Sequence, residues 1–186
     1  MDLQQAIRSR RAVRAFTAQP VDRAVLLRLI DAAIQAPSAV NEQPWFFTVI
    51  EDPAALRRIS TASKAHVLAT PPRAVSSTHL QMLRDPQFDI FYHAPALIVI
   101  SSVTANEWAV ENCTLAAENL MLAACAEGLG SCWIGFAQTW LGTAAGKAAL
   151  GVPPSYLPVA PIIVGHPQSM PPAVPRKPPE IRWIGT

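Results

Sequence analysis

Four arginines stand close together near the start of the chain, at Arg8, Arg10, Arg11 and Arg14. Arginine presents a planar fork of N–H donors that matches phosphate oxygens, and one charge-assisted bond of this kind contributes about 1.5–3 kcal/mol. Three such side chains together can hold a phosphate monoester. The cluster can also be a solvated helix end, because the last turn of a helix favours cations. Both interpretations are open from the cluster alone.

A second polar group of residues lies in the segment 36–45, Ala-Pro-Ser-Ala-Val-Asn-Glu-Gln-Pro-Trp. Ser38, Asn41 and Gln43 carry hydroxyl and amide groups that can pair with the polar edge of a heterocycle. The segment connects an expected helix to an expected strand, and such loops often carry ligand contacts. Serine and asparagine are also common turn formers, so this segment has a purely structural interpretation as well.

The segment 128–136, Gly-Leu-Gly-Ser-Cys-Trp-Ile-Gly-Phe, is rich in glycine but is not a dinucleotide-binding fingerprint. That fingerprint follows a strand, opens a helix and has a third glycine. This segment follows an expected helix, enters an expected strand and lacks that glycine. Gly135 instead favours the close approach of a flat ligand to the backbone at a strand end.

Other chemistries have little support in the sequence. No HxxxH or HExxH spacing joins the histidines, so we expect no metal site, and no GxSxG elbow indicates a serine hydrolase. The three cysteines form no CxxC pair, and we see no signal peptide and no run of about 18 apolar residues, so we expect a reduced cytoplasmic protein without membrane contact. The net charge of +2 is too balanced for general nucleic-acid binding.

Capping residues place the first three expected helices. Asp2 with Gln5 forms a capping box, Asp22 caps a second helix that Pro37 ends, and Asp52-Pro53 starts a third. Strands are expected where apolar and β-branched residues run together, at 46–50, 97–100, 131–134 and 159–164. The first of these is predicted to be covered on both faces. The chain is therefore predicted to be an α+β domain.

The most apolar predicted helix spans residues 106–127 and is closed by Gly128. Its polar residues occupy one narrow stripe, so it must be buried on several sides. In a small domain this favours packing against both the sheet and a second copy of the chain, although a central helix buried within one subunit has the same pattern. Residues 64–92 have weak periodicity and are predicted to be loop with one short helix.

The chain of 186 residues fits one compact domain, which we place at residues 1–166. Six of the thirteen residues 167–179 are proline, which predicts an extended tail over 167–186. The tail ends in Ile181-Arg-Trp-Ile184, and because exposed apolar residues of this size are unfavourable, we expect it to pack on the partner subunit.

Together these segments resemble the nitroreductase family of FMN proteins over nearly the whole chain. The resemblance rests on Arg-Arg-x-x-Arg at 10–14, Pro-Ser-x-x-Asn-x-Gln-Pro-Trp at 37–45, Gly-x-Gly-Ser-Cys-Trp-Ile-Gly at 128–135 and Pro-Arg-Lys-Pro at 175–178, in that order. It implies a central, mainly antiparallel or mixed sheet flanked by helices, and a homodimer with FMN bound non-covalently at the interface.

The resemblance also implies roles for particular residues. Arg10, Arg11, Ala12 and Arg14 match the phosphate and ribityl contacts, and Arg176 matches an arginine that returns to the phosphate. The loop that reaches the partner's flavin is matched by Pro37, Ser38, Ala39, Asn41 and Gln43. Ile134 and Gly135 match the backbone that faces the reactive part of the isoalloxazine. The family often has serine where Ala12 and Ala39 stand, so two hydroxyl bonds to the flavin are absent here.

The implied activity is transfer of electrons from NAD(P)H through FMN to a small acceptor, such as a nitroaromatic or a quinone, by a ping-pong mechanism in which no side chain acts as acid or base. Two alternatives are open at this point. One is another flavin-dependent chemistry on the same fold, either oxygen-dependent flavin cleavage or reductive dehalogenation. The other is a non-catalytic protein that binds FMN, or nucleic acid through its basic N-terminus.

Overall fold

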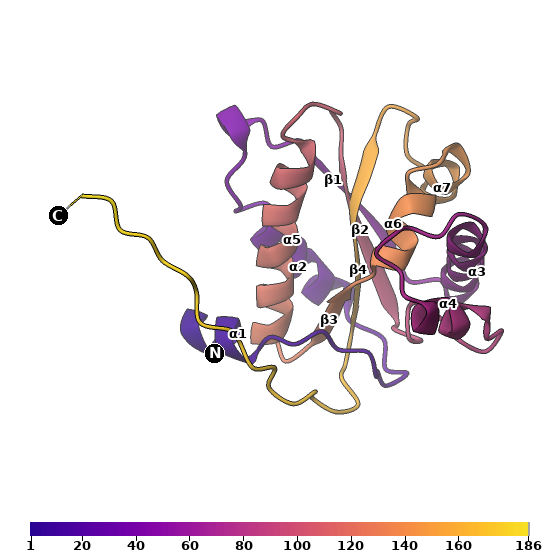
Figure 1. Cartoon of the computed structure of the whole chain (residues 1–186), viewed down its shortest axis with the longest axis horizontal. Coiled ribbons are helices and arrows are strands. Elements are labelled where there is room, and N and C mark those ends of the chain that lie inside the picture. Colours follow the sequence, from indigo (N-terminus) through magenta and orange to yellow (C-terminus); the bar gives the residue numbers. More distant parts are fainter. Residues whose placement is uncertain (186) are drawn as a thin grey trace.

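The computed structural model describes residues 1–185 as helices on both sides of one four-stranded sheet (Figure 1). The elements follow one another as α1 (Leu3–Ser9), α2 (Arg23–Ala33), the 3-10 helix η1 (Ala39–Asn41), β1 (Trp45–Ile50), α3 (Pro53–Ala69), α4 (Ser77–Arg84), β2 (Ala96–Ser102), α5 (Ala109–Ala126), β3 (Gly130–Trp133), α6 (Gly135–Leu141), α7 (Ala144–Leu150) and β4 (Leu157–Gly165).

The sheet has the strand order β1-β2-β4-β3, and every neighbouring pair is antiparallel. This confirms the predicted α+β class and its mainly antiparallel sheet. The central strands β2 and β4 are buried almost throughout, as their Ile- and Val-rich sequences require. The register between β2 and β4 shifts between Ile100 and Ser101, where Val159 of β4 is the extra residue of a bulge.

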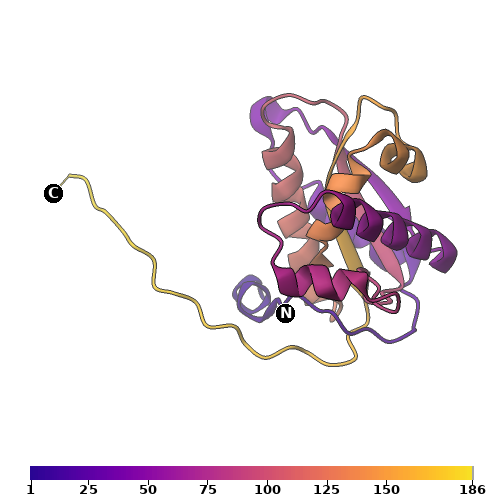
Figure 2. The same ribbon diagram turned by 45° about the vertical axis from the view of Figure 1, so that its right-hand side comes forward.

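Each face of the sheet has its own hydrophobic core. One core lies between the sheet and helices α2 and α5, and includes Leu29, Leu120 and Ile162, all fully buried. The other lies between the sheet and helices α3, α6 and α7, and includes Leu97, Leu141 and Ile163. Figures 1 and 2 show the resulting three layers, with α4 beyond the sheet on the side of α3.

The predicted helix boundaries are confirmed where side chains satisfy the free N–H groups of the first turn. Asp2 and Gln5 form the capping box, Asp22 accepts from Ala24 N, and Asp52 accepts from Ala54 and Ala55 N ahead of Pro53. At the other end of α5, Gly128 has φ +75°, the left-handed conformation in which glycine ends a helix. Over residues 1–185, no helix is long and apolar enough to span a bilayer.

Three sequence-based expectations were wrong. Strand β1 is not covered on both faces: it is an edge strand, and Phe46 and Val49 are 40% and 37% exposed. Residues 64–69 are not loop but the last turns of α3, although the one short helix expected after them is present as α4. Gly135 does not end a strand, because β3 stops at Trp133 and Gly135 is the first residue of α6.

Beyond β4 the chain crosses back to the N-terminal segment before it leaves the body. Phe16 pairs with Pro167, and Gln168 N donates to Ala15 O. Residues 171–185 contain no helix or strand, and they run away from the rest of the molecule in both views (Figures 1 and 2). Trp183 and Ile184 at the end of this segment are 86% and 91% exposed.

Candidate functional site

The arginine-rich segment leaves its helix and runs along the edge of the sheet. Helix α1 ends at Ser9, so only Arg8 lies in its last turn. Ala12 then forms a parallel bridge with Ser131 of β3, and Val13 N donates to Ser131 O at 3.0 Å. Arg11 and Arg14 therefore lie on extended backbone fixed to the sheet, and a solvated helix end does not account for them.

The guanidinium groups of this segment keep unused donors. Arg11 donates from NH1 to the carbonyl oxygens of Arg8 and Arg10, at 2.7 and 2.8 Å. Arg10 Nε lies 3.3 Å from a Glu118 carboxylate oxygen on α5, without hydrogen-bond geometry. Within residues 1–185, the Nε atoms of Arg10 and Arg11 are both buried with no hydrogen-bond partner. Buried donors of this kind are costly unless a ligand satisfies them.

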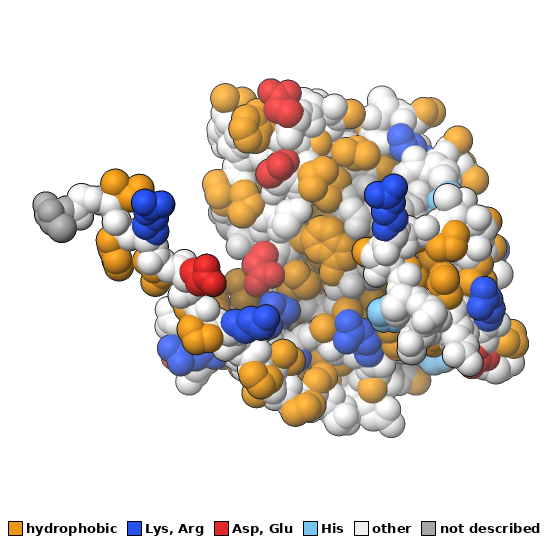
Figure 3. All heavy atoms as spheres, viewed as in Figure 1, with side chains coloured by type: hydrophobic (Ala, Val, Ile, Leu, Met, Phe, Trp, Pro, Cys, Tyr) orange, Lys and Arg blue, Asp and Glu red, His pale blue; other side chains and the backbone are white. Residues whose placement is uncertain are grey.

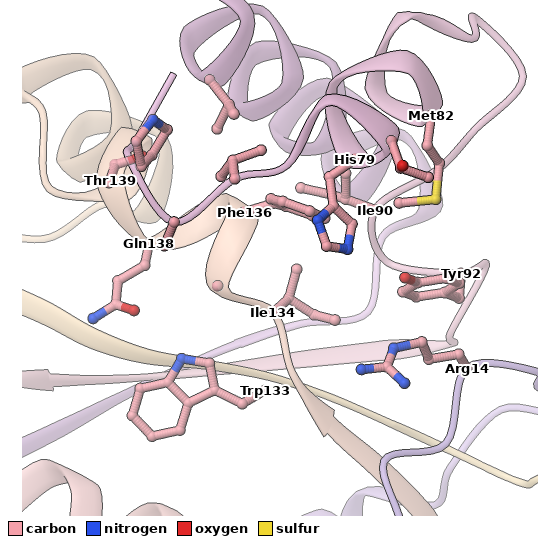
Figure 4. A pocket seen from close by; sticks show the side chains of 16 residues that line it. Arg14, His79, Met82, Ile90, Tyr92, Trp133, Ile134, Phe136, Gln138 and Thr139 are labelled. Carbon is pink, nitrogen blue, oxygen red and sulfur yellow. The ribbon is translucent and has the colours of Figure 1, made fainter. Parts of the chain in front are cut away.

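A cavity of about 780 Å³ lies beside this segment, large enough for a cofactor with part of a second molecule. Its walls come from Arg14, the end of β3, the start of α6, and the stretch from α3 through α4 to residue 92 (Figure 4). The lining is mainly apolar, with aromatic and aliphatic side chains that include Ile90, Trp133, Ile134 and Phe136. This composition is typical of a pocket for a flat, largely apolar ligand.

Ile134 and Gly135, which the resemblance assigns to the isoalloxazine, both line this cavity. A Cβ atom added at Gly135 would meet no heavy atom within 4 Å, so the space beside its backbone is open. Gly135 is also the first residue of α6, and the first N–H groups of a helix have no partner inside the helix. Ile134 N donates to Pro161 O and Ala137 N donates to Ile134 O, so the N–H groups of Gly135 and Phe136 are the ones left for a ligand at the cavity wall.

Tyr92 reaches the same cavity from a strained turn. Tyr92 and His93 have φ values of +53° and +56°, which are unfavourable for residues other than glycine. The turn is held by the Asp89 carboxylate, which accepts from Phe91 N and His93 N at 3.1 and 3.0 Å. The Tyr92 ring lies 6.0 Å from the Arg14 guanidinium, within cation–π range (Figure 4).

Burial raises the pKa of two groups at or next to the cavity, the Tyr92 phenol and the Cys132 thiol. Burial raises the pKa of the Tyr92 phenol, and the Arg14 charge opposes that shift only in part. Burial likewise raises the pKa of the Cys132 thiol against the opposing charges of Arg14 and Arg10. A thiol kept protonated is a poor nucleophile, so Cys132 is not a reactive cysteine. Among residues 1–185, no group of three or more metal-ligating side chains gathers at one place.

Residues 64–92, whose role the sequence did not indicate, form the far wall of the cavity. Lys64 on α3 donates from Nζ to the carbonyl oxygens of Asp85 and Phe88, both at 2.6 Å. These bonds tie the segment after α4 to α3. Helix α4 then presents Thr78, His79 and Met82 to the cavity. Sequence reasoning missed these residues and Tyr92, because no local motif marks side chains that only tertiary packing brings to a pocket.

The loop of residues 37–43 lies at the other end of α5. Ala39 N donates to the Asn112 side chain near the start of α5, whereas Ser9 at the end of α1 meets Cys125 near its end. Thirteen helical residues separate these two points, a rise of about 20 Å. Ser38, Asn41 and Gln43 therefore do not reach the cavity of their own chain.

Val40, Asn41 and Gln43 in this loop all have positive φ, at +47°, +55° and +50°, and Val40 is 98% exposed. The conformation is held from outside the loop: Glu42 accepts from Thr104 Oγ1 at 2.8 Å and from Asn106 Nδ2 at 3.0 Å. Strain of about 1–3 kcal/mol per residue persists only where the surroundings enforce it, and such positions cluster at functional sites.

The structure thus gathers some of the predicted site residues and not others. Arg14, Ile134 and Gly135 line one cavity, and Arg10, Arg11 and Ala12 belong to the segment that leads to it. The loop that contains Pro37, Ser38, Ala39, Asn41 and Gln43 is remote within the chain. Arg176 lies in the exposed segment that leaves the body and is not brought to the cavity of its own chain.

The fold and the cavity define an α+β protein with a cofactor-sized pocket at the edge of an antiparallel sheet. The family model described as the Nitroreductase family matches residues 7–166, and the chain belongs to this family of oxidoreductases.

The curated relatives match only part of this chain. An NADH dehydrogenase of Thermus thermophilus is 38% identical over 73 residues, which is 38% of this chain and 36% of that protein. A 4-nitrobenzoate reductase of Pseudomonas putida is 34% identical over 95 residues, covering 50% of this chain and 34% of that protein. The matched part thus spans about a third of each curated relative. The crystal structure of a nitroreductase with bound FMN from Bacteroides fragilis has a TM-score of 0.86 at 24% identity, with both chains fully covered, and this likeness shows the fold.

Proposed function

We propose that the protein is an FMN-dependent oxidoreductase that passes electrons from NAD(P)H to a small acceptor by a ping-pong mechanism. The observation that carries the proposal is the cavity in which Arg14 and the open backbone at Gly135 lie together, beside buried guanidinium nitrogens without partners. FMN, when bound, supplies the redox chemistry by accepting a hydride and releasing electrons to the acceptor. The names of the relatives, NADH dehydrogenase and 4-nitrobenzoate reductase, agree with this activity.

The arginine segment fits the phosphate end of FMN. The unsatisfied Nε atoms of Arg10 and Arg11 and the exposed Arg14 offer positive charge beside the cavity. The extended backbone at Ala12 fixes their spacing against β3. We expect Arg176 to join this group only when the tail is docked on a subunit. The Glu118 carboxylate opposes an anion beside Arg10, and its contact with Arg10 would weaken when phosphate binds.

At the other end of the cavity, Ile134 and Gly135 would face the isoalloxazine. The absence of a side chain at Gly135 lets a flat ring lie against the backbone. Free N–H groups at the start of α6 can donate to acceptor atoms of the ring. Such preorganised donors favour negative charge on the ligand without reorganisation, which is how a protein sets a cofactor's electronic properties.

We propose a homodimer that brings the remaining residues to the site. Trp108, Val110 and Leu115 on and beside α5 are 46–50% exposed, a large apolar surface for one subunit, and apolar side chains are visible over this face (Figure 3). A two-fold axis across it would place the loop of residues 37–43, which does not line the cavity of its own chain, beside the partner's cavity. The strain in that loop fits this role. Residues 167–186 would then pack on the partner and cover Trp183 and Ile184.

Binding of FMN and hydride transfer are tested with the purified protein. We expect a yellow dimer whose flavin is reduced anaerobically by NADH or NADPH and reoxidised by a quinone or nitroaromatic, with parallel lines in double-reciprocal plots. A colourless protein that takes up no added FMN would exclude the proposal.

The phosphate assignment is tested by Arg14→Ala and Arg10→Ala, with Arg58→Ala on the outer side of α3 as the matched control. Loss of one charge-assisted bond of about 1.5–3 kcal/mol predicts FMN affinity lower by about 10- to 150-fold. The control should bind FMN as the wild type does. Unchanged FMN affinity in both arginine variants would remove the basis for the assignment.

A further inference from the structure

His79 is the most prominent polar side chain on the wall of the cavity that faces Ile134 and Gly135. It comes from α4, and Figure 4 shows its ring turned into the cavity above Ile134, beside the ring of Phe136. The two rings are 5.8 Å apart in an edge-to-face arrangement at 67°. Phe136 therefore limits the positions open to the imidazole.

One hydroxyl group makes two contacts with His79. Ser76, the N-cap of α4, accepts a hydrogen bond at Oγ from the backbone N–H of His79 at 3.3 Å. The same Oγ lies 2.9 Å from His79 Nδ1. A hydroxyl has one hydrogen and two lone pairs, so Oγ can donate to Nδ1 while one lone pair accepts from the backbone N–H. In this arrangement Nδ1 is the acceptor, and in the neutral imidazole Nε2 carries the proton.

The surroundings of Nε2 leave that donor for a ligand. Across residues 1–185, no hydrogen bond is formed by Nε2, and the neighbouring side chains Met82, Ile90 and Phe136 are apolar. The charged Arg14 lies with Tyr92 toward the arginine segment. The cavity thus has a cationic end that suits a phosphate, and an apolar part in which His79 offers one directed N–H donor.

We propose that His79 is a specificity-determining residue that donates a hydrogen bond from Nε2 to an oxygen of a flat aromatic or quinoid acceptor. The oxygen is the quinone carbonyl or nitro oxygen on which negative charge grows as electrons arrive. Phe136 and Met82 contact the ring of that acceptor. This inference rests on the proposed function. For a quinone the overall reaction is quinone + NAD(P)H + H⁺ → hydroquinone + NAD(P)⁺, with one proton from solvent, and His79 retains its own proton.

The test separates the two half-reactions of the FMN-loaded protein by anaerobic stopped-flow absorbance. His79→Phe keeps a flat ring against Phe136 but removes the donor, His79→Gln restores an N–H donor, and His66→Phe on α3, outside the cavity lining, is the matched control. Each FMN-loaded variant is first fully reduced with dithionite so that the reoxidation rates are compared from the same reduced state, and His66→Phe should also be reduced by NADH at the wild-type rate. Reoxidation of His79→Phe by 1,4-benzoquinone should be at least tenfold slower, with substantial recovery in His79→Gln. Ferricyanide needs no directed donor and should reoxidise all of them equally.

Reoxidation of His79→Phe by benzoquinone at the wild-type rate would overturn the inference. A wild-type protein that binds no FMN, or whose flavin NADH does not reduce, would instead contradict the proposed function. A second measurement does not depend on turnover: ¹⁵N NMR of histidine-labelled wild-type protein at pH 8.5, with His79→Gln used for assignment. We expect the Nε2–H tautomer at His79, and the Nδ1–H tautomer would refute the proposed donor even if a variant failed to fold.

Discussion

Replacement of Gly130 by alanine tests whether packing beneath the arginine segment sets the geometry of the phosphate site. Gly130 begins β3, and a Cβ atom added there would lie 2.7 Å from both Cβ and Cγ1 of Val13. Ordinary contacts of a Cβ begin near 3.4 Å, so one of the two residues must move by about 0.7 Å. Val13 is 1% exposed and lies between Arg11 and Arg14. Movement of Val13 therefore displaces the arginine segment from β3.

The expected size of the effect follows from overpacking. Insertion of one methyl group into a filled site costs about 1–3 kcal/mol of unfolding free energy. A displaced guanidinium loses part of a bond of about 1.5–3 kcal/mol, so FMN affinity should fall by about five- to tenfold. Gly128→Ala is the control, since its Cβ would meet nothing within 4 Å and only its φ of +75° is unfavourable, at about 1–2 kcal/mol. That change should leave FMN affinity unaltered.

Urea unfolding and flavin fluorescence titration measure the two quantities, and Val13→Ala completes a double-mutant cycle. Val13→Ala alone removes buried methyl groups at a cost of about 2 kcal/mol. Alanine at position 13 removes the contacts with Cγ1 and Cγ2 but keeps Cβ, 2.7 Å from the added atom, so Gly130→Ala should become partly less harmful and the double variant should be more stable than the sum of the single changes predicts. The reasoning is refuted if the effects are additive and Gly130→Ala binds FMN as tightly as Gly128→Ala does.

Three further predictions concern the stability of the fold and of the loop of residues 37–43. Burial raises the pKa of the Cys113 thiol to about 12, so the unfolded chain loses its proton first as the pH rises. The unfolding free energy should therefore decrease between pH 9 and 12 by up to about 1.4 kcal/mol per pH unit from this group, and the difference in slope between wild type and Cys113→Ala in urea unfolding measures it. A Cβ atom added at Gly146 would overlap Trp140 O and lie 2.5 Å from Leu141 Cα, and both are backbone atoms. Gly146→Ala should therefore lower the unfolding free energy by about 3 kcal/mol or more, whereas Gly142→Ala, whose nearest contact is 3.5 Å, should lower it by less than about 1 kcal/mol. Equal midpoints of the two variants in thermal unfolding would contradict this. Glu42→Ala should release the loop that it holds, seen as faster hydrogen exchange at the Gln43 amide, and unchanged exchange would show that the loop holds itself.

Most of the fold was predictable because local signals agreed with tertiary packing. The carboxylates of Asp22 and Asp52 mark their helix starts by chemistry that acts within three residues. Helices α6 and α7 were not predicted, since seven-residue helices are marginal alone and depend on the core they cover. The apolar run of β1 indicated burial but not position in the sheet. At the edge, Phe46 is covered mainly by an edge-to-face contact with Tyr156, 110 positions later in the chain.

In the candidate site, too, the sequence predicted some residues and not others. The type and spacing of the arginines predicted an anion site, and the structure places Arg14 in the cavity. Tyr92 and His79 could not be found from sequence, because each reaches the cavity through a distant scaffold: an Asp89-anchored turn for Tyr92, and for His79 a helix whose following segment Lys64 ties to α3. Neither scaffold leaves a periodic or motif-like signal, since its contacts join residues far apart in the chain.

The backbone of the loop of residues 37–43 is the main structural reason for the proposed dimer. Val40, Asn41 and Gln43, none of them glycine, have a left-handed backbone conformation. Val40 also presents an apolar side chain almost entirely to solvent. The Glu42 contacts stabilise this conformation, yet within residues 1–185 the side chains of Ser38 and Asn41 form hydrogen bonds only inside the loop. A conformation that is both strained and enforced, yet without function in its own subunit, indicates selection for a contact with another molecule. In the proposed dimer the partner's cavity would supply such a contact, and this is the physical argument for that proposal.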